Sequence, residues 1–117
     1  MQHMSSCIFC KIAAGEIPSK KVYEDDQVVA IHDIEPQAPV HVLVIPKKHI
    51  LGVNDLAAED EAIVGHAYTV IGKLVKDLGV ADTGYRVVVN SGRDGQQSVP
   101  HLHFHILGGR MLAWPPG

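Results

Sequence analysis

Three histidines near the end of the chain are the residues best suited to chemistry. His101, His103 and His105 alternate with apolar residues, and this pattern predicts a strand over His101–Leu107. Side chains at i, i+2 and i+4 of a strand share one face, so the imidazoles line up while the intervening residues enter a core. Imidazole can act as an acid, base, nucleophile or metal ligand near neutral pH. A single histidine here would be read as a sheet residue, but three in register predict a functional site.

The two cysteines of the chain form a second candidate site as Cys7-x-x-Cys10. This spacing on one helical turn suits either a pair of zinc ligands or a redox pair. Nothing nearby indicates the βαβ setting of a thioredoxin. Two buried thiols that pack as small apolar groups are the remaining interpretation.

Hydrophobic periodicity and turn residues predict the elements that position these side chains. One helix is expected over Cys7–Ala14, ended by Gly15, and a longer one over Ala57–Leu78, ended by Gly79. Five strands are expected, at Lys20–Glu24, Gln27–His32, Val40–Ile45, Tyr85–Asn90 and His101–Leu107. Short strands with two helices predict a single α+β domain over residues 1–117 with a mainly antiparallel five-stranded sheet.

Composition narrows the partners and the compartment. The net charge of −3 and pI of about 6.2 give no basic surface for extended nucleic acid. No apolar run approaches the roughly 18 residues of a membrane span, and no signal peptide is evident. We therefore expect a soluble, cytoplasmic protein without membrane partners. The segment Met1-Gln2-His3 before Met4 is typical of a cloning remnant.

The signature His101-Leu102-His103-Phe104-His105 resembles that of the histidine triad (HIT) family. Leu107-Gly108-Gly109 follows it, which is similar to the purine nucleoside phosphoramidase branch rather than the diadenosine polyphosphate hydrolases, where Pro-Arg is usual. Further matching motifs run along nearly the whole chain: Cys7-Ile8-Phe9-Cys10-Lys11-Ile12, Gly15-Glu16-Ile17-Pro18, His32-Asp33-Ile34, Pro36-Gln37-Ala38-Pro39, Ile45-Pro46-Lys47-Lys48-His49, Gly84-Tyr85-Arg86-Val87-Val88-Val89-Asn90, Gly108-Gly109-Arg110 and Trp114-Pro115-Pro116-Gly117. The resemblance implies a HIT-like fold whose sheets join across a homodimer.

The resemblance also implies catalytic roles for the triad. His103 would be the nucleophile that attacks phosphorus and forms a covalent nucleotidyl-histidine. A backbone carbonyl on the triad strand would hold its other ring N–H. His105 would donate to phosphate oxygens, with His101 completing the triad. Ser98 matches the residue that relays a proton to the leaving group, although a loop hydroxyl bonded to nearby backbone is the alternative.

Substrate contacts are implied for a second set of residues. Asp33 matches the ribose-binding carboxylate, Ile34 a base contact and Asn90 a contact on the ribose-phosphate side. The remaining matches are the base wall and the phosphate loop, namely Phe9, Ile12, Ile17, Gln96, Gln97 and Ser98. Without the family, Asp33 would be read as a turn cap and the apolar trio as core.

One position departs from the family pattern. The family loop commonly reads Gly-Gly-Gln-Ser, whereas this chain has Gly95-Gln96-Gln97-Ser98. If the position of Gln96 requires a positive φ, a residue other than glycine there is strained or shifts the loop.

Some relatives with the same Cys-x-x-Cys bind zinc with histidines that match His49 and His101. A structural Zn²⁺ site of Cys7, Cys10, His49 and His101 is therefore implied, with no position left for water. We interpret the remaining histidines as sheet or surface residues, namely His32, His41 and His66.

The predicted activity is hydrolysis of the P–N bond of purine nucleoside 5′-phosphoramidates (AMP- or GMP-amine conjugates), with no cofactor for the chemistry. Hydrolysis of dinucleoside polyphosphates or adenylylsulfate is the alternative within the family. A metallohydrolase with the triad as zinc ligands, and a non-catalytic nucleotide-binding scaffold, are alternatives outside it. We expect Trp114 to pack at the dimer interface, and the alternative is that it plugs the core of its own chain.

Overall fold

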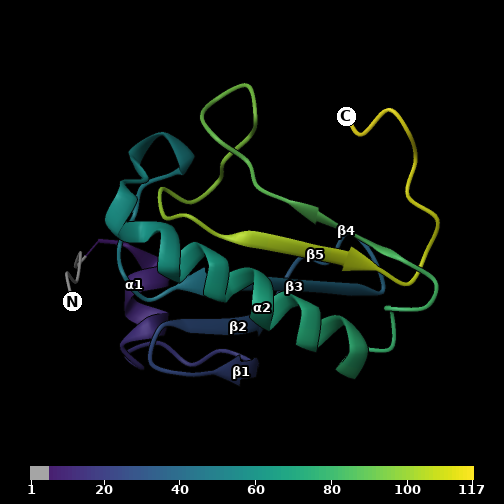
Figure 1. The fold of residues 1–117 in the computed structure, drawn as a ribbon, viewed down its shortest axis with the longest axis horizontal. Helices are drawn as coiled ribbons and strands as arrows, with labels where there is room; N and C mark the ends of the chain where they lie inside the picture. The colour runs from purple at the N-terminus through teal and green to yellow at the C-terminus, as the bar shows by residue number, and fades with distance from the viewer. Residues whose placement is uncertain (1–5) are drawn as a thin grey trace.

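The computed structural model describes residues 6–117, so the predicted cloning remnant at residues 1–3 lies outside the described residues. One antiparallel sheet has the strand order β1-β2-β3-β5-β4 (Figure 1). Its strands are β1 (Lys21–Glu24), β2 (Val28–His32), β3 (Val40–Pro46), β4 (Tyr85–Val88) and β5 (Phe104–Gly108). With helices α1 (Ile8–Ala13) and α2 (Glu61–Asp77), this confirms the predicted α+β class. Over residues 6–117, neither helix combines the length and the apolar character that crossing a membrane requires.

Helix α2 covers one face of the sheet (Figure 1). It buries Ala67, Val70, Ile71, Leu74 and Val75 against inward-facing side chains of β2, β3 and β5. Leu102 and Phe104 join the same core, as the alternating pattern predicted. The buried side chains of this cluster are apolar, and the candidate site lies on the other face of the sheet.

The predicted start of the long helix at Ala57 is wrong, because α2 begins at Glu61 after a short 3-10 turn, η2 (Ala58–Asp60). The Asp60 carboxylate accepts the Ala57 N–H (2.9 Å) and pairs with Lys48 (2.5 Å), which holds this turn in its tight form. The predicted end is confirmed by Gly79, whose φ of +76° suits glycine.

Helix α1 packs on the opposite face, where it covers part of the sheet. Cys7 is its N-cap, and Gly15, with a φ of +78°, follows its end as predicted. The side chains packed in this apolar cluster come from α1, β2 and β3: Cys7, Phe9, Cys10, Ile12, Ala13, Val29, Ile31, Leu43 and Ile45. His105 pairs with Leu43 across β3 and β5, so its side chain lies on this same face.

The triad is less regular than the predicted strand over His101–Leu107, since β5 begins only at Phe104. Two backbone bonds hold the preceding residues out of the ladder: His101 N–H donates to the Val99 carbonyl (2.8 Å) and Leu102 N–H to the Ile50 carbonyl (2.7 Å). The alternation nevertheless persists, with Leu102 in the α2-side core and both His101 and His103 against Phe9 on the α1 side.

Candidate functional site

His103 is buried with one ring nitrogen committed. Its Nδ1 lies 2.7 Å from the His101 carbonyl, which can only accept, so Nδ1 carries the proton. In the neutral ring, Nε2 then holds the lone pair of a nucleophile. Burial lowers the pKa of His103, opposed by this hydrogen bond and by Asp33, so the ring is neutral at pH 7. The carbonyl that the resemblance implied is present.

His41 lies on β3, as the interpretation as a sheet residue predicted, and its ring also contacts this site. Its Nδ1 accepts the Gln37 N–H (3.0 Å), so its proton sits on Nε2. That Nε2 lies 2.9 Å from Nδ1 of His105 and 3.3 Å from Oδ2 of Asp33. Two neighbouring strands bring these residues together over 64 positions of sequence. The available signal was a lone polar residue inside the apolar run Val40–Pro46.

The proton on His41 determines the tautomer of His105. Because Nδ1 of His105 accepts from His41, its Nε2 carries the hydrogen of the neutral ring. This Nε2 is buried and has no hydrogen-bond partner among the described residues. Burial, reinforced by the charges that His103 and His41 could carry, lowers the pKa of His105 to about 4. A buried donor without a partner indicates a place for an acceptor such as a phosphoryl oxygen.

His103 and His105 therefore offer complementary groups side by side, with ring centroids 4.9 Å apart. One presents a lone pair and the other an N–H. The arrangement can attack an electrophilic centre and stabilise the charge that develops on its oxygen.

The predicted base and ribose contacts lie at different depths. Ile34 is 94% exposed, and Asp33 is half-buried beside His41, where it also accepts the Glu35 N–H (2.8 Å) as the turn cap expected without the family. Phe9 and Ile12 are buried in the α1 cluster, and Phe9 lies edge-on to His103 at 5.0 Å.

The predicted phosphate loop follows β4. Asn90 is half-buried, whereas Ser98 is exposed. Gln96 has a φ of +58°, so this position does demand the conformation that glycine adopts most readily. The carboxamide of Gln97 is bonded within the protein, to Leu51, Val99 and Gly92.

Cys7, Cys10, His49 and His101 converge as the zinc prediction requires. Nδ1 of His101 lies 3.3 Å from Sγ of Cys7, 3.6 Å from Sγ of Cys10 and 3.2 Å from Nδ1 of His49. The ligands of a tetrahedral zinc stand roughly 3.3–3.7 Å apart, given bonds of about 2.0–2.3 Å. His101 Nε2 lies 2.7 Å from the Pro46 carbonyl, to which it must donate, so Nδ1 is unprotonated and faces the other donors. These four residues fit a zinc ion.

Asp33, His41 and His105 form another cluster with the spacing of metal ligands. Its hydrogen bonds argue for a proton instead. Gln37 already donates to one nitrogen of His41, so the other carries the hydrogen and cannot ligate a metal in the neutral ring. His103 lies in neither potential metal cluster found among the described residues, which does not favour the three triad histidines as one metal site.

The C-terminal tail carries Trp114 on the outside. Its side chain is 80% exposed and its ring lies 5.7 Å from the Arg86 guanidinium. The alternative that this tryptophan plugs the core of its own chain is therefore wrong.

An α+β sheet protein with a paired-imidazole site is the class that this geometry defines. The HIT domain family is matched over residues 14–112. An uncharacterized HIT-like protein of Synechococcus elongatus is 50% identical over 110 residues, 94% of this chain and 96% of that protein. A HIT family hydrolase of Legionella pneumophila has a similar crystal structure, with a TM-score of 0.94, 47% identity and coverage of 96% of this chain and 100% of the other. For a histidine triad protein of Clostridium difficile the values are 0.93, 52%, 96% and 97%.

The chain belongs to the HIT domain family. The similarity to HIT family hydrolases supports hydrolysis as its general reaction type.

Proposed function

We propose that this protein hydrolyses the P–N bond of purine nucleoside 5′-phosphoramidates. The observation that carries the proposal is the pair of fixed tautomers, in which His103 presents a lone pair on Nε2 beside the N–H of His105. The motifs of the phosphoramidase branch support the choice of substrate. Asp33 would bind the ribose hydroxyls and Ile34 the base.

In the first step, Nε2 of His103 attacks phosphorus and the P–N bond breaks. The bonding electron pair leaves on nitrogen, which takes a proton from solvent through the exposed Ser98 hydroxyl so that a neutral amine departs. Nε2–H of His105 donates to a non-bridging oxygen as negative charge gathers there. In the second step water attacks the nucleotidyl-histidine, loses a proton and releases the nucleoside monophosphate, which restores neutral His103.

Incubation with an AMP-amine conjugate, followed by intact-mass measurement, tests this mechanism. Wild-type protein should release AMP and show a transient mass increase of one nucleotidyl group. His103→Ala should lose turnover and adduct while keeping AMP affinity within about tenfold, because ribose and base contacts remain. Near wild-type turnover in His103→Ala would contradict the covalent step. Faster cleavage of a dinucleoside polyphosphate would favour the alternative within the family, and AMP binding without any turnover would favour a scaffold.

We further propose a structural zinc on Cys7, Cys10, His49 and His101. It would cross-link α1 to the triad segment and take no part in the reaction, since four protein ligands leave no open position. Protein purified without chelator should contain about one zinc per chain. Cys7→Ser should lower zinc content and melting temperature while the nucleotidyl adduct still forms on His103. Absence of zinc from freshly reduced protein would favour buried thiols, and activity that is lost in proportion to zinc would favour a metallohydrolase.

Dimerisation through the edge of the sheet is the third part of the proposal. Strand β4 is an edge strand with β5 as its only neighbour in the sheet of residues 6–117, and such an edge can pair with a second copy. Trp114 and Met111 are exposed on the tail nearby, which suits an interface near the partner's active site. Deleting the residues after Arg110 should change the preference among AMP-amines more than AMP affinity. A monomer in sedimentation at micromolar concentration, or an unchanged substrate profile, would contradict this part.

A further inference from the structure

The side chain of Gln97 bonds at once to backbone near it in the sequence and to the backbone of Leu51, 46 positions away. Its Nε2 donates to the carbonyls of Leu51 (2.7 Å) and Val99 (3.0 Å), and its Oε1 accepts the Gly92 N–H (3.2 Å). A carboxamide has two N–H donors, and both are used here. The side chain therefore has no hydrogen left to donate to a phosphate oxygen.

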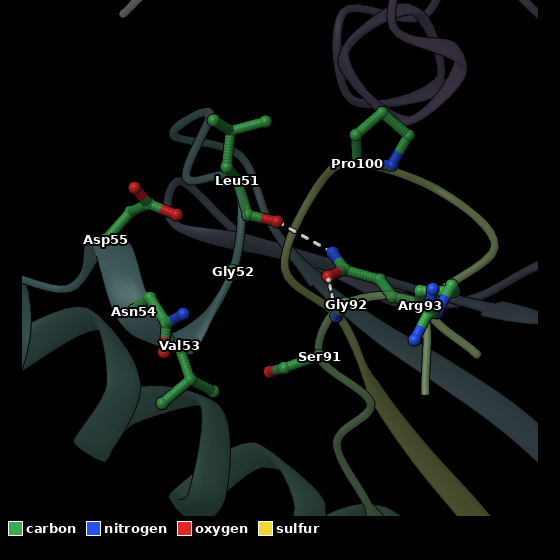
Figure 2. Close-up of a pocket in the computed structure, with 10 residues that line it drawn as sticks. Leu51, Gly52, Val53, Asn54, Asp55, Ser91, Gly92, Arg93 and Pro100 are labelled. Carbon is green, nitrogen blue, oxygen red and sulfur yellow. Dashed lines mark hydrogen bonds between the residues drawn. The ribbon is translucent and has the colours of Figure 1, made fainter. Parts of the chain in front are cut away.

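These bonds tie the loop of residues 91–98 to the segment just after His49. Figure 2 shows this loop and this segment facing one another across a pocket, with dashed lines that end on Leu51 and on Gly92. Leu51 lies 46 positions from Gln97, whereas the other hydrogen bonds that residues 91–98 form in the described part of the chain stay within the loop or end on Val99. Residues 91–96 are exposed, so burial contributes little to holding them in place.

The segment just after His49 is itself hydrogen-bonded to the triad segment. The Ile50 carbonyl accepts the N–H of Leu102, between His101 and His103. The triad segment is thus connected through Ile50 and Leu51 to Gln97, which directly precedes Ser98. Each link is a hydrogen bond to backbone, which fixes distance better than a contact between flexible side chains does.

Gly52, in the segment just after His49, leaves room for the side chain of Gln97. Gly52 is buried, and a Cβ added there would stand 3.3 Å from Oε1 of Gln97, closer than an ordinary contact. A cavity of about 420 Å³ lies between this segment and the loop of residues 91–98, and none of the three triad histidines is among the residues that line it. Gln97 therefore acts on the loop rather than from inside the histidine cluster.

We propose that Gln97 is a positioning residue that holds the 91–98 loop, and with it the Ser98 hydroxyl and the loop N–H groups, in register with His103. The proposal deepens the phosphoramidase function and rests on it for the identity of the reaction. A misplacement of about 1 Å in such a loop can cost about 100-fold in rate. Gln97 would thus affect the rate without touching the substrate.

Gln97→Met tests the proposal, since it keeps the length of the side chain and removes its polar atoms. Asn54→Ala is the matched control, because Asn54 lines the same cavity without forming the bridge. We expect Gln97→Met to speed amide hydrogen exchange in residues 91–98 at least about tenfold and to lower kcat about 10- to 100-fold. The affinity for AMP should fall towards that for adenosine, while adenosine affinity stays within about threefold because Asp33 and Ile34 are untouched. The control should change none of these quantities.

Each outcome separates the positioning role from other roles. A lower kcat with unchanged amide hydrogen exchange in residues 91–98 would show that Gln97 acts on the substrate directly. Faster exchange with unchanged kcat would show that the reaction does not need Gln97 to hold the loop. Either result overturns the proposal. If wild-type protein does not cleave AMP-amines, the proposed function fails. Amide hydrogen exchange and the AMP-to-adenosine affinity ratio then still test whether Gln97 holds the loop in place. Should Gln97→Met not fold, Gln97→Glu keeps the acceptor for Gly92 and removes both donors, and the same results are expected.

Discussion

Replacing His41 by alanine should slow the reaction by releasing the tautomer of His105. In the wild type, Gln37 N–H donates to Nδ1 of His41, and Nε2–H of His41 donates to Nδ1 of His105. This relay leaves the only hydrogen of His105 on Nε2, aimed at the proposed phosphate position. Without His41, His105 can hold its hydrogen on either nitrogen and can rotate.

The size of the effect follows from one hydrogen bond. A bond of 2.9 Å between neutral groups contributes about 0.5–1.5 kcal/mol net. Converted at about 1.4 kcal/mol per factor of ten, the loss of this bias lowers kcat about 2- to 12-fold. Rotational freedom of His105 adds to the loss, so we expect a fall of about tenfold or somewhat more.

Single-turnover cleavage of an AMP-amine is the assay, because it isolates the chemical step from product release. His32→Ala is the matched control, since His32 is an exposed histidine at the end of the neighbouring strand β2. Added imidazole should restore part of the rate of His41→Ala by occupying the vacated space. A folded His41→Ala protein with wild-type single-turnover rate would refute the relay.

Three further predictions concern stability. Leu102→Ala should lower the free energy of unfolding, measured by chemical denaturation, by about 2–5 kcal/mol, because Leu102 is 1% exposed in the α2-side core. Leu51→Ala, at an exposed position, should change it by no more than about 0.5 kcal/mol. A loss under about 1 kcal/mol for Leu102→Ala would contradict the packing. Gln96→Gly should be more stable than Gln96→Val by at least about 1 kcal/mol, because φ is +58°, and equal stability would mean that the loop relaxes. Stability should fall as pH drops from 6.5 towards 4, because the unfolded chain takes up a proton at the ordinary histidine pKa while folded His105, with its pKa lowered to about 4, does not. His105→Gln should make that fall shallower in thermal melts across the same range, and an unchanged slope would assign it to other groups.

Local patterns along the chain were enough for the type of nearly every element. Apolar alternation predicted the strands, and glycines at 15 and 79 marked the helix ends because each adopts a positive φ that other residues avoid. The triad pattern likewise placed Leu102 and the histidines on opposite sides. These features depend on neighbours within a few positions, so the sequence alone carries them.

Hydrogen bonds that apolar periodicity does not reveal, some of them between distant segments, decided where two of the elements begin. The predicted strand over His101–Leu107 lost its first three residues because the Ile50 and Val99 carbonyls take the N–H groups there. The start of α2 moved because the Asp60 carboxylate is bonded to Ala57 and Lys48. Each of these outcomes depends on a partner that the local pattern does not identify.

The two cysteines and three triad histidines were recognisable from residue type and spacing, because chemistry that needs particular side chains leaves them in the sequence. The protonation pattern of the site was not recognisable there. His41 faces His105 only because β3 and β5 pair in a particular register, and Gln97 reaches Leu51 only because the loop folds back over 46 positions. A hydrogen-bond partner far along the chain is set by tertiary packing, so the sequence alone determined the reactive groups and the folded structure decided which nitrogen holds the proton.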